Sequence, residues 1–181
     1  MMKKIKLIVA LCLLCFLCAC GKNEKRVDVK EYVIPGKIMF LPEDDKETKE
    51  HIVANMKGQQ SLEDVYLNDD EDVVMVMTEE QCRASLSNSE MLIKEMMDLY
   101  VGEKAKYSIN AERNVVELYV DTKETLGDGF YQSKIYNILD TLFLCQILND
   151  VDITDAKVEV KINYMNTDTS EVINYTIDDM P

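Results

Sequence analysis

The sequence predicts an α+β fold: an antiparallel sheet built from repeated helix–hairpin units, with the helices packed on one face. Signals for helix starts occur near Pro42, Thr78 and Phe130, and two short strand-like stretches follow each predicted helix. Apolar residues are 47% of the 181 residues, enough for a folded core. Because pairs of strands separate the helices, antiparallel pairing is expected.

The first unit is expected to open with a strand over residues 37–41. A helix over residues 42–57 follows, because Pro42 is tolerated in a first helical turn and Gly58 is a typical C-cap. Residues 62–67 and 73–77 then form a hairpin. The second of these strands is apolar on both faces, which predicts a central position in the sheet.

The second unit begins at Thr78, which caps a helix together with Gln81 three residues later. Residues 87–90 repeat the capping chemistry, so the helix either continues or breaks and restarts there. The hairpin that follows covers residues 105–109 and 115–121. Tyr119 lies on the face of its strand opposite Leu118 and is a candidate for an exposed interaction patch.

The third unit contains the longest apolar helix, over residues 130–149, which is expected to be the most deeply buried element. Residues 157–164 and 172–177 form its hairpin. The alternation along the first strand predicts a core face and a solvated face, the core face being Val158, Val160, Ile162 and Tyr164 and the solvated face Lys157, Glu159, Lys161 and Asn163.

The first twenty residues are typical of a secretory signal. Lysines at positions 3, 4 and 6 precede an apolar run over residues 7–19, which is shorter than the roughly 20 residues that a membrane span needs. The sequence Leu17-Cys18-Ala19-Cys20 resembles the lipobox of bacterial lipoproteins. The resemblance implies cleavage before Cys20 and attachment of a diacylglycerol to its sulfur. The predicted organisation is a signal peptide over residues 1–19, the lipidated Cys20 with a polar tether over residues 20–30, and a single α+β domain over residues 31–181.

A diacylglyceryl group supplies two acyl chains, and two chains anchor a protein firmly to a bilayer. The expected location is therefore the outer face of the bacterial cytoplasmic membrane, or the outer membrane if the source has two membranes. The whole chain has a net charge of −14, which disfavours nucleic acid as a partner. The membrane and an envelope protein or cell-wall component are the expected partners.

Other candidate sites have simpler interpretations. Asn68, Asp70, Asp72 and Glu79 mimic the spacing of a calcium loop, but Val73 stands where such a loop needs glycine. His51 is expected on the surface of a helix, and residues 127–129 are expected to be a turn. We expect no catalytic residues, no metal site and no cofactor. Two cysteines lie in the predicted domain, Cys82 and Cys145, either as buried thiols or as a disulfide.

Residues 115–162 have the order strand, loop, helix and strand, with Thr141-Leu142 in the helix. This order resembles the second half of the GerMN domain of spore-germination and sporulation lipoproteins, in which a helix bearing a Thr-Leu pair precedes an edge strand. The chain departs from the family in lacking its proline near Ala105. The resemblance implies a role in cell-envelope assembly or interaction.

The sequence thus favours a cell-envelope lipoprotein with a small extracytoplasmic, non-catalytic binding or assembly domain. Two alternatives stay open. One is a ligand-binding lipoprotein that serves a transporter or sensor, which would need a pocket with convergent polar groups. The other is an envelope hydrolase that uses carboxylates distant in the sequence, which would need two buried carboxylates facing one cleft.

Overall fold

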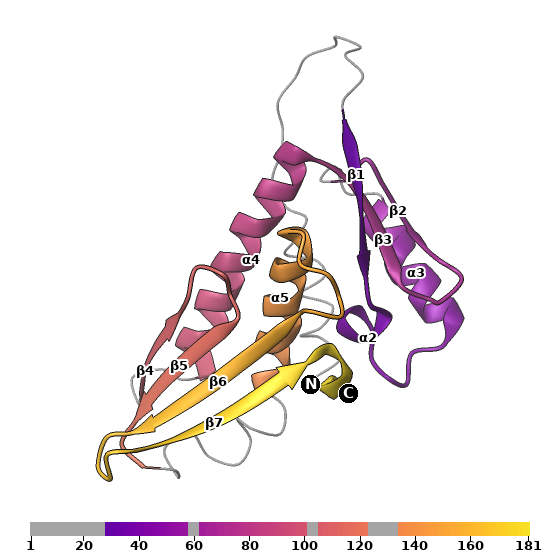
Figure 1. The fold of residues 1–181 in the computed structure, drawn as a ribbon. Coiled ribbons are helices and arrows are strands. Elements are labelled where there is room, and N and C mark those ends of the chain that lie inside the picture. Colours follow the sequence, from indigo (N-terminus) through magenta and orange to yellow (C-terminus); the bar gives the residue numbers. More distant parts are fainter. Residues whose placement is uncertain (1–27, 58–61, 101–104, 123–133) are drawn as a thin grey trace. The chain divides into compact units, whose positions relative to one another are not determined.

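The computed structural model describes residues 28–57, 62–100, 105–122 and 134–181, and these residues form an α+β fold (Figure 1). The chain divides into two compact units, the first ending at Glu90 and including Pro181, the second covering Met91–Met180. The predicted single antiparallel sheet is wrong, because the strands form two sheets and one of them is mixed. The single domain over residues 31–181 stays a prediction.

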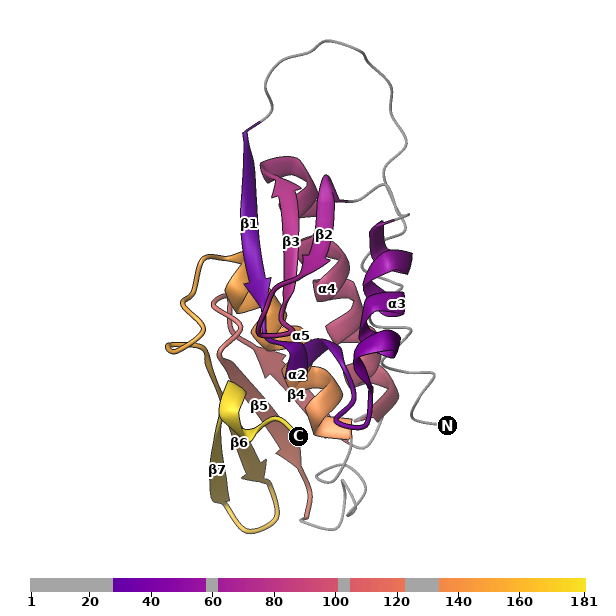
Figure 2. The same cartoon turned by 90° about the vertical axis from the view of Figure 1, so that its right-hand side faces the viewer.

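The first unit contains a three-stranded antiparallel sheet with the order β1-β3-β2. Its strands are β1 (Val29–Ile34), β2 (Asp64–Leu67) and β3 (Val73–Thr78). The predicted hairpin and the central position of β3 are confirmed. A helix, α3 (Lys46–Lys57), lies beside β2 (Figure 2).

The start of the first unit differs from the prediction. Residues 37–41 are not a strand: a one-turn helix, α2 (Gly36–Met39), lies there, and the strand precedes it. The helix predicted over residues 42–57 begins only at Lys46. The physical reason is the preceding Asp45, whose carboxylate accepts the N–H of Thr48 at 2.9 Å and so satisfies a free donor of the first turn.

One helix, α4 (Glu79–Tyr100), runs through the boundary between the units without a break. The predicted capping box is confirmed, because Gln81 N–H donates to Thr78 Oγ1 at 3.1 Å and Thr78 N–H donates to Gln81 Oε1 at 2.8 Å. The alternative of a restart at residues 87–90 is wrong. The Ser89 hydroxyl donates to the carbonyl of Ser85 at 2.9 Å, so it bonds back along the helix and starts no new one.

The second unit contains a four-stranded sheet with the order β4-β5-β6-β7. Its strands are β4 (Ala105–Ile109), β5 (Val115–Val120), β6 (Lys157–Tyr164) and β7 (Thr169–Thr176). Both predicted hairpins are present and antiparallel, but β5 and β6 are parallel. This pairing is possible because a helix, α5 (Ile135–Leu148), lies in the connection between these two strands.

The second unit has the most continuous core of the described chain. Every residue of α5 from Ile138 to Leu148 is buried, which confirms the predicted depth of this helix. On β6, Val158, Val160 and Ile162 are fully buried and their neighbours are more exposed, as the alternation predicts. The fourth residue predicted for the core face, Tyr164, is only half-buried, and its hydroxyl donates to Glu171. A short 3₁₀ turn, η4 (Ile177–Asp179), follows β7 and is capped by Thr176.

Candidate functional site

The lipid-attachment residue predicted from the sequence, Cys20, lies outside the described residues, as do residues 127–129. The described chain begins at Asp28, and β1 begins at Val29. Within the described ranges, no helix combines the length and the apolar character needed to span a bilayer.

An open depression of about 330 Å³ lies in the first unit. Its walls come from the α2 segment (residues 35–37 and 40–42), from Lys49 on α3 and from residues 70–72 in the turn between β2 and β3. Pro181 completes the lining, so two lysines, three acidic side chains and three proline rings line one space. The depression has a volume at the lower end of the range for small-molecule sites, about 300–1,000 Å³.

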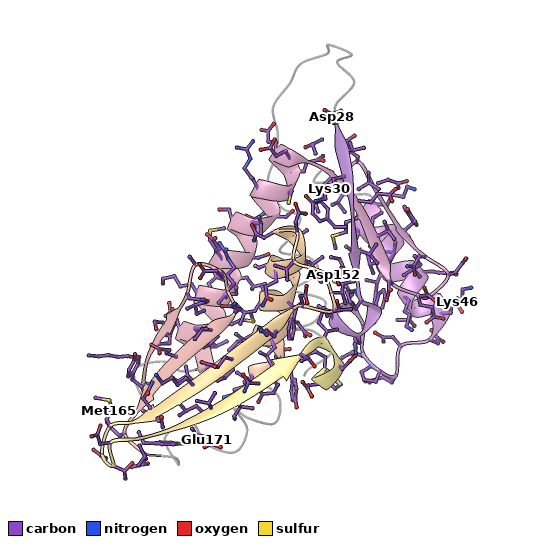
Figure 3. The ribbon with its side chains drawn as sticks, viewed as in Figure 1. Asp28, Lys30, Lys46, Asp152, Met165 and Glu171 are labelled. Atoms are coloured by element: carbon purple, nitrogen blue, oxygen red, sulfur yellow. The ribbon has the colours of Figure 1, made fainter. Side chains whose placement is uncertain are left out.

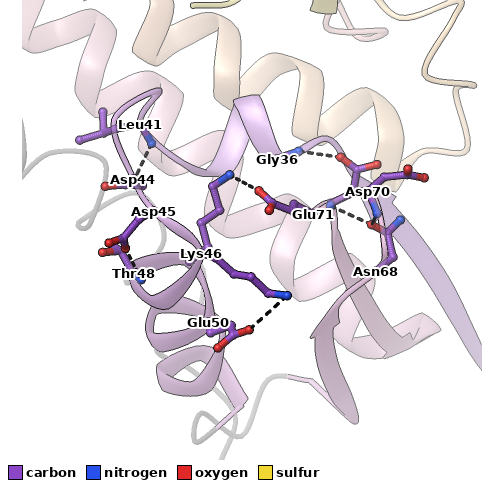
Figure 4. A network of polar contacts seen from close by, with 12 residues as sticks. Gly36, Leu41, Asp44, Asp45, Lys46, Thr48, Glu50, Asn68, Asp70 and Glu71 are labelled. Atoms are coloured by element: carbon purple, nitrogen blue, oxygen red, sulfur yellow. Dashed lines mark hydrogen bonds and ion pairs between the residues drawn. The ribbon is translucent and has the colours of Figure 1, made fainter.

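The acidic turn beside this depression is ordered by its own side chains (Figure 4). Asn68 Oδ1 accepts the N–H groups of Asp70 at 3.0 Å and of Asp72 at 2.9 Å. Glu71 has a positive φ of 62°, which an L-residue adopts only when its surroundings enforce it. The polar network of the turn provides that constraint.

The turn is joined to α2 by a close approach at Gly36. The Gly36 N–H donates to Asp72 Oδ1 at 2.9 Å. A Cβ atom at this position would lie 2.7 Å from the carbonyl oxygen of Glu71, closer than real Cβ contacts allow. Position 36 therefore requires glycine for the turn to pack against α2.

An ion pair between Lys49 and Glu71 crosses the depression. The Lys49 ammonium also lies 5.7 Å from the centre of the buried Phe40 ring, within range of a cation–π contact. The hydrogen bond from Lys49 lowers the pKa of Glu71. Glu71 is therefore ionised at neutral pH and suited to hold a charge, not to donate a proton.

The calcium-loop mimic has a structural role. The oxygens of Asn68 and Asp72 accept backbone N–H groups in and beside the turn, and Glu79 lies in the first turn of α4. In the part of the chain that the structure describes, no three His, Cys, Asp or Glu side chains are grouped as a metal ion would require.

A second polar cluster lies on the solvated face of the four-stranded sheet, around Glu117. Its Oε2 accepts the Tyr119 hydroxyl at 2.7 Å and the Ser108 hydroxyl at 3.4 Å, and its Oε1 lies 3.5 Å from Lys161 Nζ. The hydrogen bond from Tyr119 is the main cause that lowers the pKa of Glu117, and it raises the pKa of Tyr119. Tyr119 is half-buried in this cluster, while Leu118 on the other face is fully buried.

The remaining sequence candidates are distributed over the molecule. His51 is exposed on α3. Cys82 and Cys145 are buried thiols, 5% and 0% exposed, so the disulfide alternative is not realised. Sequence reasoning missed Gln146, a buried amide within the most apolar helix. Its Nε2 donates to the carbonyls of Arg113 and Lys157, both at 3.0 Å, and so joins α5 to the turn between β4 and β5 and to the start of β6.

The strand–helix–strand order behind the GerMN resemblance is present as β5, α5 and β6. In GerMN the strand after the helix is an edge strand, whereas β6 lies between β5 and β7. Compared with known proteins, the chain matches no family model, no curated protein and no solved structure.

Proposed function

We propose that this protein is a cell-envelope lipoprotein, anchored through a diacylglyceryl group on Cys20. The anchor would hold it to the outer face of the bacterial cytoplasmic membrane, or to the outer membrane if the source has two. The exported part would be a non-catalytic binding or assembly domain. Three successive helix–hairpin segments, α3–β2–β3, α4–β4–β5 and α5–β6–β7, would be its building units.

The observation that carries the proposal is the sequence up to Cys20: three lysines, an apolar run and a lipobox, in that order. The distance to the folded part supports it. Eight residues separate Cys20 from Val29, where β1 begins. Fully extended, they would span at most about 29 Å, so the domain would stay close to the bilayer surface.

The carboxylates at the centres of the two polar clusters, Glu71 and Glu117, support a binding role more than a catalytic one. A general acid needs a raised pKa, whereas hydrogen bonds lower the pKa values of both Glu71 and Glu117. Both clusters thus present fixed charges to solvent. The GerMN resemblance, taken as a hypothesis, adds a role in envelope assembly.

The experiment that tests the anchor is replacement of Cys20 by Ala in the full chain, with Cys18→Ala as the matched control in the same lipobox. The expected result is that Cys20→Ala loses membrane retention and diacylglyceryl labelling, while Cys18→Ala keeps both. Equal retention and labelling of both variants would refute lipidation.

A second experiment tests the binding role. In the same cells, a photo-reactive residue in place of Tyr119 is expected to form one discrete adduct with a partner, whereas a photo-reactive residue in place of the exposed Ala54 is not.

A further inference from the structure

Four strands lie at sheet edges in the described chain, and β7 differs from the other three. Natural edge strands are usually short or carry charges that prevent pairing with another chain. The strand β2 has four residues, β4 has five and includes Lys106, and β1 includes Lys30 and Glu31. By contrast, β7 has eight residues with a single charge, no proline and no lysine.

The single charge on β7 is turned away from the solvated face. Glu171 lies opposite Ile162, on the side of the sheet where β6 is buried, and its carboxylate accepts the Tyr164 hydroxyl at 2.9 Å. The solvated face of β7 consists of uncharged residues: Ser170, Val172, Asn174 and Thr176. The Val172 side chain is 48% exposed. Figure 3 marks Glu171 on β7 and Met165 at the tip of the β6–β7 hairpin.

The register shows which backbone groups of β7 point outward. The Glu159 N–H donates to the carbonyl of Asn114 at 2.8 Å, so odd-numbered residues of β6 direct their N–H and C=O groups toward β5. Because these directions alternate along a strand, the even-numbered residues of β6 face β7. They lie opposite odd-numbered residues of β7. The even-numbered residues of β7 therefore direct their backbone groups away from the sheet.

The open part of this edge is short and symmetric. The outward N–H of Thr176 already donates to Asp179 Oδ2 at 2.7 Å. For Ser170, Val172 and Asn174, the described residues supply no partner to the outward N–H and C=O groups. These three residues are centred on Val172, so a two-fold axis normal to the sheet and just outside Val172 would place two such edges side by side in matching register.

We propose that this edge pairs with the same edge of a second copy of the chain, antiparallel and centred on Val172. Val172 then lies opposite Val172 of the other copy, and Ser170 lies opposite Asn174, so six backbone hydrogen bonds form. No like charges meet at the paired stretch, although each chain has a net charge of −14. Because this edge carries no charge, it would not preferentially attract a charged segment of another protein.

The pairing closes on itself, because each edge covers the other and no further copy can be added there. It joins two four-stranded sheets into one continuous sheet and brings the two exposed Val172 side chains side by side on its solvated face. The contact is small, which indicates a weak or transient dimer. It does not depend on the lipid anchor, although anchoring both copies to one surface would raise their effective concentration.

The experiment is disulfide trapping in whole cells that produce the full chain with Val172→Cys. In a hydrogen-bonded antiparallel pair the Cα atoms are about 5.5 Å apart, which a disulfide can span. The matched control is Ser108→Cys, at the other edge of the same cross-strand row, which runs Ser108, Glu117, Lys161 and Val172. The unsubstituted chain gives the background from the protein's own cysteines.

After mild oxidation, Val172→Cys is expected to give at least about tenfold more dimer than Ser108→Cys, as judged by mass on a non-reducing gel. Equal trapping of the two variants overturns the proposal, and so does a Val172→Cys adduct with the mass of another protein. A second variant, Val172→Lys, should lower the dimer fraction of the detergent-solubilised full chain in sedimentation, and Ser108→Lys should not. Because both variants keep the same first 30 residues, the ratio of their dimer yields does not depend on whether the protein is anchored.

Discussion

The helices of the two units differ in burial: α3 buries only Val53 and Met56, whereas α5 buries every residue from Ile138 to Leu148. In the first unit, polar side chains accept nearby backbone N–H groups, as Asn68 does in the turn and Asp45 does at the start of α3. In the second unit, the parallel pair β5–β6 joins residues 44 positions apart, such as Glu117 and Lys161, and α5 is buried along most of its length.

This difference in burial determines where a single substitution should cost most stability. Burial of apolar side chains stabilises a fold through area, and removal of a fully buried side chain leaves a cavity. A polar turn stabilises through geometry, and its individual hydrogen bonds each contribute little. We therefore expect the largest single-residue effects in α5, intermediate ones at Gly36 and the smallest at the part-buried Lys49–Glu71 ion pair.

The largest effect is expected for Leu142→Ala, because Leu142 is fully buried in α5. The free energy of unfolding should fall by about 2–5 kcal/mol, measured by urea denaturation. Leu99→Ala is the matched control, since Leu99 is 75% exposed on α4 and the same change there should stay within about 0.5 kcal/mol. Equal losses for the two variants would contradict the burial assigned to α5.

An intermediate effect is expected for Gly36→Ala. The added Cβ would lie 2.7 Å from the carbonyl oxygen of Glu71, so either α2 or the turn must shift. We expect a loss of about 1–3 kcal/mol in the free energy of unfolding. Amide chemical shifts should change at Asp70 and Asp72 and stay constant on β7. A variant as stable as the parent would show that the turn does not require this close approach.

The smallest effect is expected for the pH dependence of the Lys49–Glu71 pair. The hydrogen bond from Lys49 lowers the pKa of Glu71 below its ordinary value of 4.5, so the folded state binds fewer protons than the unfolded state. The stabilisation is therefore complete above about pH 4.5 and is lost as the pH falls through the lowered pKa.

Glu71→Gln removes this contribution. Its urea midpoint should lie slightly below that of the parent at about pH 7, and the difference should shrink as the pH falls below about 4.5. Glu43→Gln is the control, because the Glu43 side chain is exposed. If the difference in urea midpoint between Glu71→Gln and the parent grows as the pH falls, the pKa of Glu71 is not lowered by folding.

Several elements of the fold could be predicted because their signals are local. Thr78 and Gln81 are three residues apart and cap α4, and the alternation along β6 assigns Val158 and Val160 to the core. The strand β1 was missed because an edge strand of mixed polarity resembles a tether. The residues that follow it form α2, where Gly36 and its contact with Glu71 decide the local geometry.

The arrangement of the strands and the depression could not be predicted, because both depend on residues far apart in the sequence. Nothing near Val115 or Lys157 shows that their strands pair in parallel across α5. Likewise, Lys49 and Glu71 contact each other at the depression although they are 22 positions apart in the sequence. Gln146 carried one usable signal, an amide within an otherwise apolar helix, which indicates a buried hydrogen-bonding role.

The most direct measurement on the proposed anchoring is the mass of the N-terminal peptide of the protein isolated from its native membranes. The account predicts a peptide that begins at Cys20 and carries a diacylglyceryl group on its sulfur. A peptide that begins at Met1, with an unmodified sulfur at position 20, would contradict it.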